Sequence, residues 1–153
     1  MARRMSEEKV TKTLLQWLIS SGWEIICYDF PQSGTGKVLH PSNTTSKTDG
    51  AIIPDIIAYR NQVVVDFENK DRFVLADFEK VHFLKSTNLY EISLNTLLRN
   101  HPYKKIYYGI GMPYTENYYK KAIEQASLVD FLAFVNEDGS IMVSNDLDNI
   151  FNV

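Results

Sequence analysis

The 153-residue sequence predicts an α/β fold of three layers, in which helices flank a mixed sheet made of an antiparallel meander and a crossover strand. Two observations predict it. Residues 52–70 contain two runs rich in Val, Ile, Tyr and Phe on either side of Asn61-Gln62, which is typical of a β-hairpin. After residue 70, segments with apolar residues at helical spacing alternate with short apolar runs. The expected order is helix, three strands, one or two helices, strand, helix and strand.

The N-terminal part is expected to supply the first helix and the first strand. Ser6 can cap a helix that carries apolar residues at helical spacing and ends at Gly22. Trp23–Phe30 is predicted to be the first strand. The following segment, Pro31–Gly50, is rich in Gly, Ser and Thr and is long for a hairpin connection, and such loops are often functional.

The predicted hairpin consists of Ile52–Arg60 and Val63–Lys70. A two-residue turn sets the register, and counting back along both strands places Asp55 directly opposite Glu68. Side chains that face each other in an antiparallel pair have Cβ atoms about 4.5–5.5 Å apart. Two carboxylates at that distance repel, so we expect a cation between them. Lys70 lies two residues beyond Glu68 and therefore on the same face.

The C-terminal half is expected to alternate helices and strands. A helix starting at Asp71 would present an apolar face from residues 74–84, and a second helix is predicted over 89–98. The remaining predictions are a buried strand at Lys104–Met112, a helix over 118–126, a strand at Asp130–Val135, a turn at 136–139 and a pairing strand at Ile141–Ser144.

Composition sets limits on the class of protein. The length predicts a single domain over residues 1–153, and the 44% apolar and 23% charged content can form a packed core. We see no membrane-spanning run and no signal peptide, and with Cys27 as the single cysteine no internal disulfide can form, so we expect a cytoplasmic protein. The net charge of −3 is unusual for a DNA-binding protein and is the main compositional argument against one.

Pro54-Asp55, followed on the next predicted strand by Glu68-Asn69-Lys70, resembles the signature of the PD-(D/E)xK nuclease superfamily. This is the fold of most type II restriction endonucleases and of several resolvases and repair nucleases. The resemblance extends roughly from Ser6 to Pro113, and the predicted element order agrees with it. It implies a restriction-endonuclease-like core and Mg²⁺-dependent hydrolysis of DNA, with Mn²⁺ able to substitute.

Each residue of the motif has an expected role in phosphodiester hydrolysis. Asp55 and Glu68 would hold the metal ion, because Mg²⁺ prefers oxygen ligands and keeps several waters. Lys70 would orient or polarise the attacking water or stabilise the developing charge. The resemblance suggests the carbonyl of Asn69 as a third ligand. The alternative is a buried ion-pair cluster without a metal. Asp66, on the same face, is either a second-site ligand or bonded to a core partner.

Four further residues are candidates for weaker roles. The resemblance suggests Glu7 or Glu8 as an additional metal ligand, direct or through water, whereas simple complementation of the helix dipole would also place them in a first helical turn. Lys37 and Lys47, in the long loop, are candidates for contacts with the DNA backbone, and a solvated loop is the alternative. A Walker A phosphate loop is rejected because Val38 follows Lys37.

The leading functional hypothesis is a small type II restriction endonuclease acting on double-stranded DNA. The family implies a homodimer, because one compact domain would need a partner to reach both strands. A resolvase or repair nuclease has the same active site and is the nearest alternative. A catalytically silent version of the fold, used to bind DNA or protein, is the alternative from another functional class.

Overall fold

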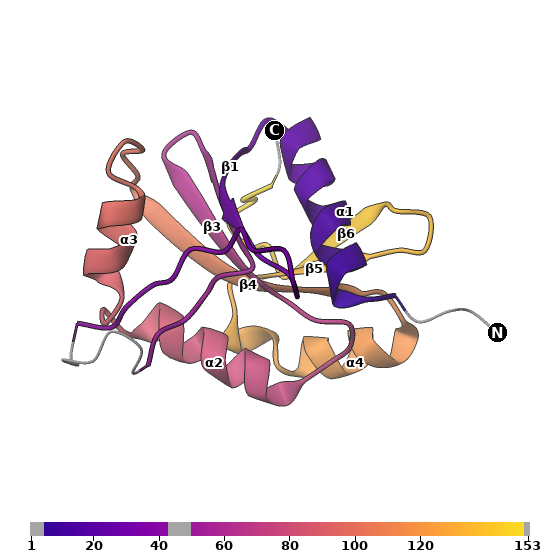
Figure 1. The fold of residues 1–153 in the computed structure, drawn as a ribbon. Coiled ribbons are helices and arrows are strands. Elements are labelled where there is room, and N and C mark those ends of the chain that lie inside the picture. The colour runs from indigo at the N-terminus through magenta and orange to yellow at the C-terminus, as the bar shows by residue number, and fades with distance from the viewer. Residues whose placement is uncertain (1–4, 43–49, 152–153) are drawn as a thin grey trace.

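The structure, a computed structural model, describes residues 5–42 and 50–151. Its centre is a mixed sheet whose strands lie in the spatial order β1-β2-β3-β4-β5-β6 (Figure 1). The strands are β1 (Glu24–Tyr28), β2 (Ile56–Arg60), β3 (Val63–Asn69), β4 (Lys105–Pro113), β5 (Phe131–Val135) and β6 (Ile141–Ser144). The helices are α1 (Glu7–Ser20), α2 (Leu75–Ser86), α3 (Glu91–Leu97), α4 (Glu116–Glu124) and the short 3-10 helix η1 (Ala126–Leu128).

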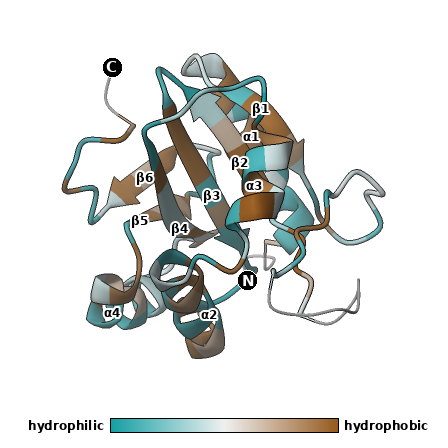
Figure 2. Cartoon of the chain, turned by 90° about the vertical axis from the view of Figure 1, so that its left-hand side faces the viewer, coloured by the Kyte–Doolittle hydropathy of each residue, from teal (hydrophilic) through white to brown (hydrophobic). Residues whose placement is uncertain are grey.

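Helices cover both faces of the sheet, which gives three layers (Figure 1). The α1 side chains pack with Val65 and Phe67 of β3 on one face. Val64 of the same strand packs with α3 on the other face, because successive strand residues point to opposite sides. On that second face, α2 and α4 pack over β4 and β5. Figure 2 shows hydrophobic residues along the strands and mixed polarity on the helices. The predicted α/β class with a mixed sheet is confirmed.

Strand pairing follows the predicted meander and crossover. β1, β2 and β3 pair antiparallel, β4 and β5 join in parallel, and β6 returns antiparallel to β5. Arg60 pairs with Val63, which is the predicted hairpin register. Asn61 and Gln62 have φ values of +51° and +68°, the pattern of a type I′ turn, whose twist matches that of the strands.

Three predicted element boundaries are wrong. β2 begins at Ile56 rather than Ile52, because Pro54 has no N–H for a ladder and Ile52 instead makes an isolated bridge with Leu39. The helix predicted from Asp71 begins at Leu75, after an extended Val74 with no side-chain cap. The first strand is shorter than predicted, because only Glu24–Tyr28 pairs with β2.

The N-terminal helix forms as predicted. Ser6 has an extended backbone, and its side chain accepts a hydrogen bond from the Lys9 N–H. The chain leaves the helix at Gly22, whose φ of +88° is the left-handed conformation common after a helix end. Within residues 5–42 and 50–151, none of the helices has the length and apolar content needed to cross a membrane.

Candidate active site

The two predicted carboxylates meet where β2 begins and β3 ends. Ile56 pairs with Phe67, so the same register continued by one residue sets Asp55 opposite Glu68. The Asn69 N–H donates a hydrogen bond to Asp55 Oδ2 at 2.7 Å, which ties the two strands together beside Glu68. The Asp55 carbonyl also accepts from the Asp29 N–H at 2.8 Å. Asp55 is therefore held at its side chain by Asn69 and at its backbone by Asp29.

Burial and a neighbouring carboxyl group disfavour the ionisation of Asp55. Burial, followed by repulsion from Glu68, raises the pKa of Asp55 to about 8, against the lowering effect of the Asn69 N–H. Burial also raises the pKa of Glu68, although Lys80 opposes the shift. A cation at this position would favour the charged form of both groups.

Lys80 is a member of the site that the sequence did not single out. Its Nζ lies 3.2 Å from Glu68 Oε1, and their side chains are 40% and 12% exposed. Burial by itself would lower the pKa of Lys80, but the charges of Glu68, Asp55 and Asp77, together with the hydrogen bond to Glu68, raise it. Asp77, one turn earlier on α2, joins the cluster, and its buried Oδ2 has no hydrogen bond within the part of the chain that the structure describes. The sequence offered one indication of Asp77 and Lys80, namely that both are charged residues early in the helix predicted after Lys70.

Lys70 is an electrostatic neighbour of the carboxyl groups at this end of the sheet. It follows β3, is half-buried, and its backbone N–H donates to the Gly111 carbonyl of β4 at 3.0 Å. Its positive charge lowers the pKa of Glu68, of Glu7 and of Asp77 against the effect of burial. An amine thus flanks the carboxyl cluster on the side of α1 and α2.

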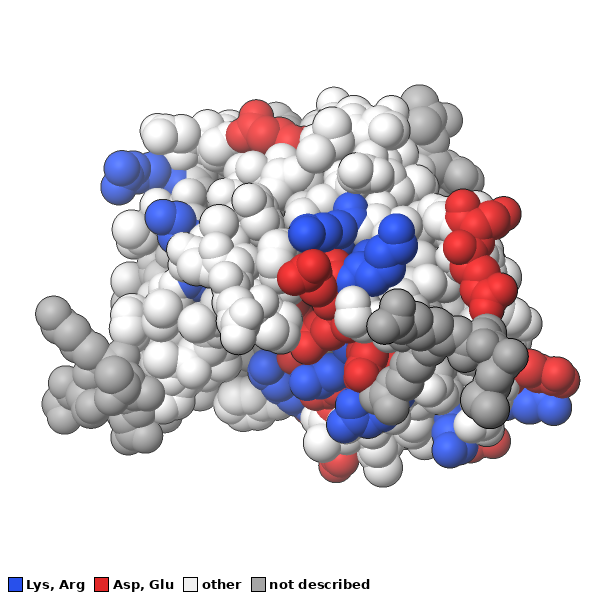
Figure 3. All heavy atoms as spheres, turned by 45° about the vertical axis from the view of Figure 1, so that its right-hand side comes forward, with Lys and Arg blue, Asp and Glu red and all other residues white. Residues whose placement is uncertain are grey.

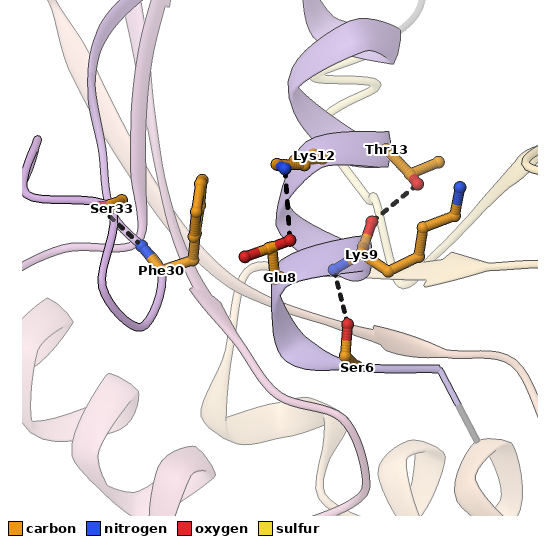
Figure 4. A network of polar contacts seen from close by, with 7 residues as sticks. All are labelled: Ser6, Glu8, Lys9, Lys12, Thr13, Phe30 and Ser33. Carbon is orange, nitrogen blue, oxygen red and sulfur yellow. Dashed lines mark hydrogen bonds and ion pairs between the residues drawn. The ribbon is translucent and has the colours of Figure 1, made fainter.

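The structure distinguishes the two glutamates of the first helical turn. Glu7 is half-buried and senses Lys70 and Glu68, so it faces the cluster. Glu8 instead pairs with Lys12, one turn along the same helix, at 3.2 Å (Figure 4). Lys12 in turn lies over the ring of Phe30, 5.3 Å from its centroid. Of the two candidates, Glu7 lies towards the carboxyl cluster, whereas Glu8 pairs along its own helix.

Asn69 anchors the end of β3 to α1. Its side chain points to the α1 face, where Nδ2 donates to Thr11 Oγ1 at 3.1 Å. Gly111 leaves room for it, because a Cβ there would lie 2.4 Å from Asn69 Oδ1 and 2.5 Å from Leu14. The strand end that carries Glu68 is therefore fixed to the sheet and to α1 together.

The remaining candidates lie apart from the cluster or outside the described residues. Lys37 is exposed on the loop after β1, and its charge acts on Cys27, whose pKa it lowers against the larger effect of burial. Lys47 lies outside the described residues. Asp66 is buried on the Glu68 face of β3, and burial raises its pKa well above the ordinary value, with Glu68 adding to the effect.

The donor set fits Mg²⁺, which is usually held by one or two carboxylates and keeps several waters. Asp55 and Glu68 supply the carboxylates; burial and the charge of Glu68 disfavour the charged form of Asp55, whereas Glu68 is paired with Lys80. Within residues 5–42 and 50–151, no three His, Cys, Asp or Glu side chains form a preformed metal-binding group.

Acidic and basic side chains gather in a mixed cluster on the face shown in Figure 3. No protein-family model matches the chain, and no curated protein sequence resembles it at a significant level.

Proposed function

We propose that this protein is a Mg²⁺-dependent endonuclease of the PD-(D/E)xK type that hydrolyses phosphodiester bonds in double-stranded DNA, and specifically a small restriction endonuclease. The observation that carries the proposal is the contact between the two halves of the motif. Asp55 accepts a hydrogen bond from the backbone of Asn69, the residue between Glu68 and Lys70. The Pro-Asp and the Glu-x-Lys, carried by neighbouring strands of one hairpin, thereby share one end of the sheet.

The arrangement of elements supports the same proposal. The chain has the element order of the restriction-endonuclease-like core: a helix, an antiparallel meander of three strands, further helices and a parallel strand beside β3. The motif lies at the end of β3, between α1 on one face and α2 on the other. Both helices contribute charged side chains to the site: Glu7 from α1 and Lys80 from α2.

The side chains divide the chemistry between them. Asp55 and Glu68 hold the metal, with the Asn69 carbonyl and Glu7 as further oxygen donors. Mg²⁺ held by these residues would supply Lewis-acid stabilisation of the phosphoryl oxygens and would make a water more acidic. Lys70 orients the attacking water or stabilises the charge that develops on the phosphate. Asn69, fixed by Thr11, keeps the strand end in position.

Cleavage of supercoiled plasmid DNA with Mg²⁺ tests this proposal. We expect the wild type to cut, and both Asp55→Asn and Lys70→Ala to lose cutting by about 100-fold or more while staying folded. Lys120→Ala is the matched control, because Lys120 is 70% exposed and, among the residues that the structure describes, pairs only with Glu116 on its own helix. Unchanged cutting by folded Lys70→Ala would remove Lys70 from the mechanism, and a wild type that never cuts would contradict the nuclease.

The pattern of products separates restriction from the related activities. Discrete bands from a plasmid indicate recognition of a base sequence, as expected of a restriction endonuclease. Preferred cutting of branched DNA over linear duplex would instead indicate a resolvase or repair nuclease, which uses the same residues.

One observation favours a second candidate, a catalytically silent version that binds DNA or protein. The Lys80 amine already neutralises Glu68, as a cation would. Lys80→Gln distinguishes the two. In a nuclease we expect this variant to bind Mg²⁺ several-fold more tightly, because the metal no longer competes with the amine. In a silent protein, neither wild type nor Lys80→Gln would bind Mg²⁺, although DNA would still shift in a gel.

A further inference from the structure

A cavity of about 270 Å³ lies on the face of the sheet that carries α2 and α3. Its wall is formed by β3, β4, the end of α2, α3 and the segments that lead into them. Asn88 and Glu91 line it and are exposed, so the cavity opens to the surface. Asp55, Glu68, Lys70 and Lys80 do not line it, so it is distinct from the candidate active site.

The carboxyl of Asp66 lines this cavity from the middle of β3. Asp66 is only 6% exposed, and the space its side chain meets is this cavity, where no hydrogen bond or ion pair from a described residue reaches its carboxyl. Leaving a buried carboxyl without a partner is unfavourable, and buried polar groups in proteins are normally hydrogen-bonded. An unsatisfied carboxyl that faces an open cavity is therefore placed to accept hydrogen bonds from a ligand.

Tyrosine rings form much of the remaining wall, from Tyr90, Tyr103 and Tyr108. The Tyr90 hydroxyl donates to the Gly50 carbonyl at 2.6 Å, and that of Tyr103 donates to Asn95 at 2.6 Å. The Tyr108 hydroxyl makes no such bond within the described chain. Because Tyr108 pairs with Asp66 across β3 and β4, the two unsatisfied groups are neighbours.

The charge of the cavity selects the kind of ligand. Asp66 and Glu91 are acidic, and no Lys, Arg or His belongs to the described lining. A phosphate or carboxylate ligand would meet repulsion and no basic partner. A cation would find the Asp66 carboxyl as a hydrogen-bond acceptor whose charged form it would stabilise, and the faces of tyrosine rings attract cations as well.

We propose that this cavity binds a small organic cation, in which an ammonium or amidinium group donates hydrogen bonds to Asp66 and a short apolar body packs among the tyrosines. The apolar walls, which include Leu94 and Ile106, suit such a body. The size agrees, since an apolar cavity of about 150 Å³ accommodates benzene. This proposal does not depend on nuclease activity.

Calorimetric titration with benzylamine, which is cationic at neutral pH, tests the proposal. Benzyl alcohol has the same shape without the charge, and benzoate has the opposite charge. We expect the amine to bind at least about 10-fold more tightly than the alcohol, and benzoate not to bind, because a charge-assisted hydrogen bond is worth that much or more. In NMR spectra, the largest shifts should fall on Asp66, Tyr108 and their neighbours.

Asp66→Asn keeps the shape of the side chain and removes its charge, so we expect about 10-fold or greater loss of benzylamine affinity. Asp138→Asn, on the exposed turn after β5, is the matched control and should bind like the wild type. If Asp66→Asn fails to fold, Thr87→Phe provides the second variant, because its ring would enter the cavity while Asp66 stays intact.

Three results would overturn the proposal: equal binding of amine and alcohol, unchanged amine binding by folded Asp66→Asn, or unchanged amine binding by Thr87→Phe. Absence of amine binding to the wild type would overturn it as well. None of these measurements involves DNA cleavage or Mg²⁺, so they leave the proposed nuclease untouched.

Discussion

Asp55 is the residue whose ionisation most affects the site. Its pKa rises from an ordinary 3.8 to about 8 in the folded protein, because burial and Glu68 disfavour the charge. Between these two values the folded protein binds more protons than the unfolded chain. Asp55 therefore makes the metal-free protein progressively less stable as the pH rises from about 4 to about 8.

Asp55→Asn should remove this penalty. We expect the variant to be more stable than the wild type by about 1–3 kcal/mol at pH near 8, with the difference shrinking towards pH 4. The amide oxygen can still accept the hydrogen bond from the Asn69 N–H. Urea denaturation of both proteins across this pH range provides the measurement.

Asp138→Asn is the control for that series, since Asp138 is exposed and its pKa is lowered by hydrogen bonds from Ser140. As the pH rises, Asp138→Asn should not become more stable than the wild type. A stability difference between wild type and Asp55→Asn that stays constant with pH would contradict the raised pKa.

The sequence was sufficient to predict residues whose placement depends on strand register alone. The meeting of Asp55 and Glu68 requires only a two-residue turn and an alternating pattern, and both are local. The contact of Lys80 with Glu68 depends on where α2 begins and how it packs on β4, which is decided by tertiary contacts. The cavity beside Asp66 is likewise assembled from segments far apart in the chain.

At the scale of elements, the β2–β3 hairpin controls the site because its turn fixes the register. Asn61 tolerates the left-handed conformation, but Gln62, with a φ of +68°, does so at a cost. Two predicted boundaries are wrong for local reasons. β2 begins only after Pro54, which has no N–H for the ladder, and Val74 rather than Asp71 precedes α2.

Gln62→Gly should stabilise the hairpin. Relief of the left-handed strain exceeds the greater freedom of glycine in the unfolded chain, so we expect a gain of about 0.5–1 kcal/mol. Thermal unfolding measures it. Gln16→Gly, at an exposed position inside α1, is the control and should lose about 0.5–1 kcal/mol. Destabilisation by Gln62→Gly would contradict the type I′ turn.

At the scale of the whole molecule, the net charge of −3 means that the proposed nuclease would have to bind DNA through a local basic surface rather than through overall charge. Bound metal would offset part of the acidity at the site. A single 17.6 kDa chain offers one such site, whereas cutting a duplex requires two.

We therefore predict that the protein acts on duplex DNA as a two-fold homodimer, which would match the symmetry of the two strands. Sedimentation of the protein with a short cleavable duplex and Ca²⁺ in place of Mg²⁺ should give a complex with two copies of the chain. A complex with one copy that still cuts both strands in Mg²⁺ would contradict the dimer.

The most direct test of the central claim is a calorimetric titration of the wild type and Asp55→Asn with Mg²⁺ and with Mn²⁺. If Asp55 and Glu68 share a divalent ion, the wild type binds both metals and the folded variant binds them at least about 10-fold more weakly. Equal metal binding by the two proteins, or none by either, would contradict it.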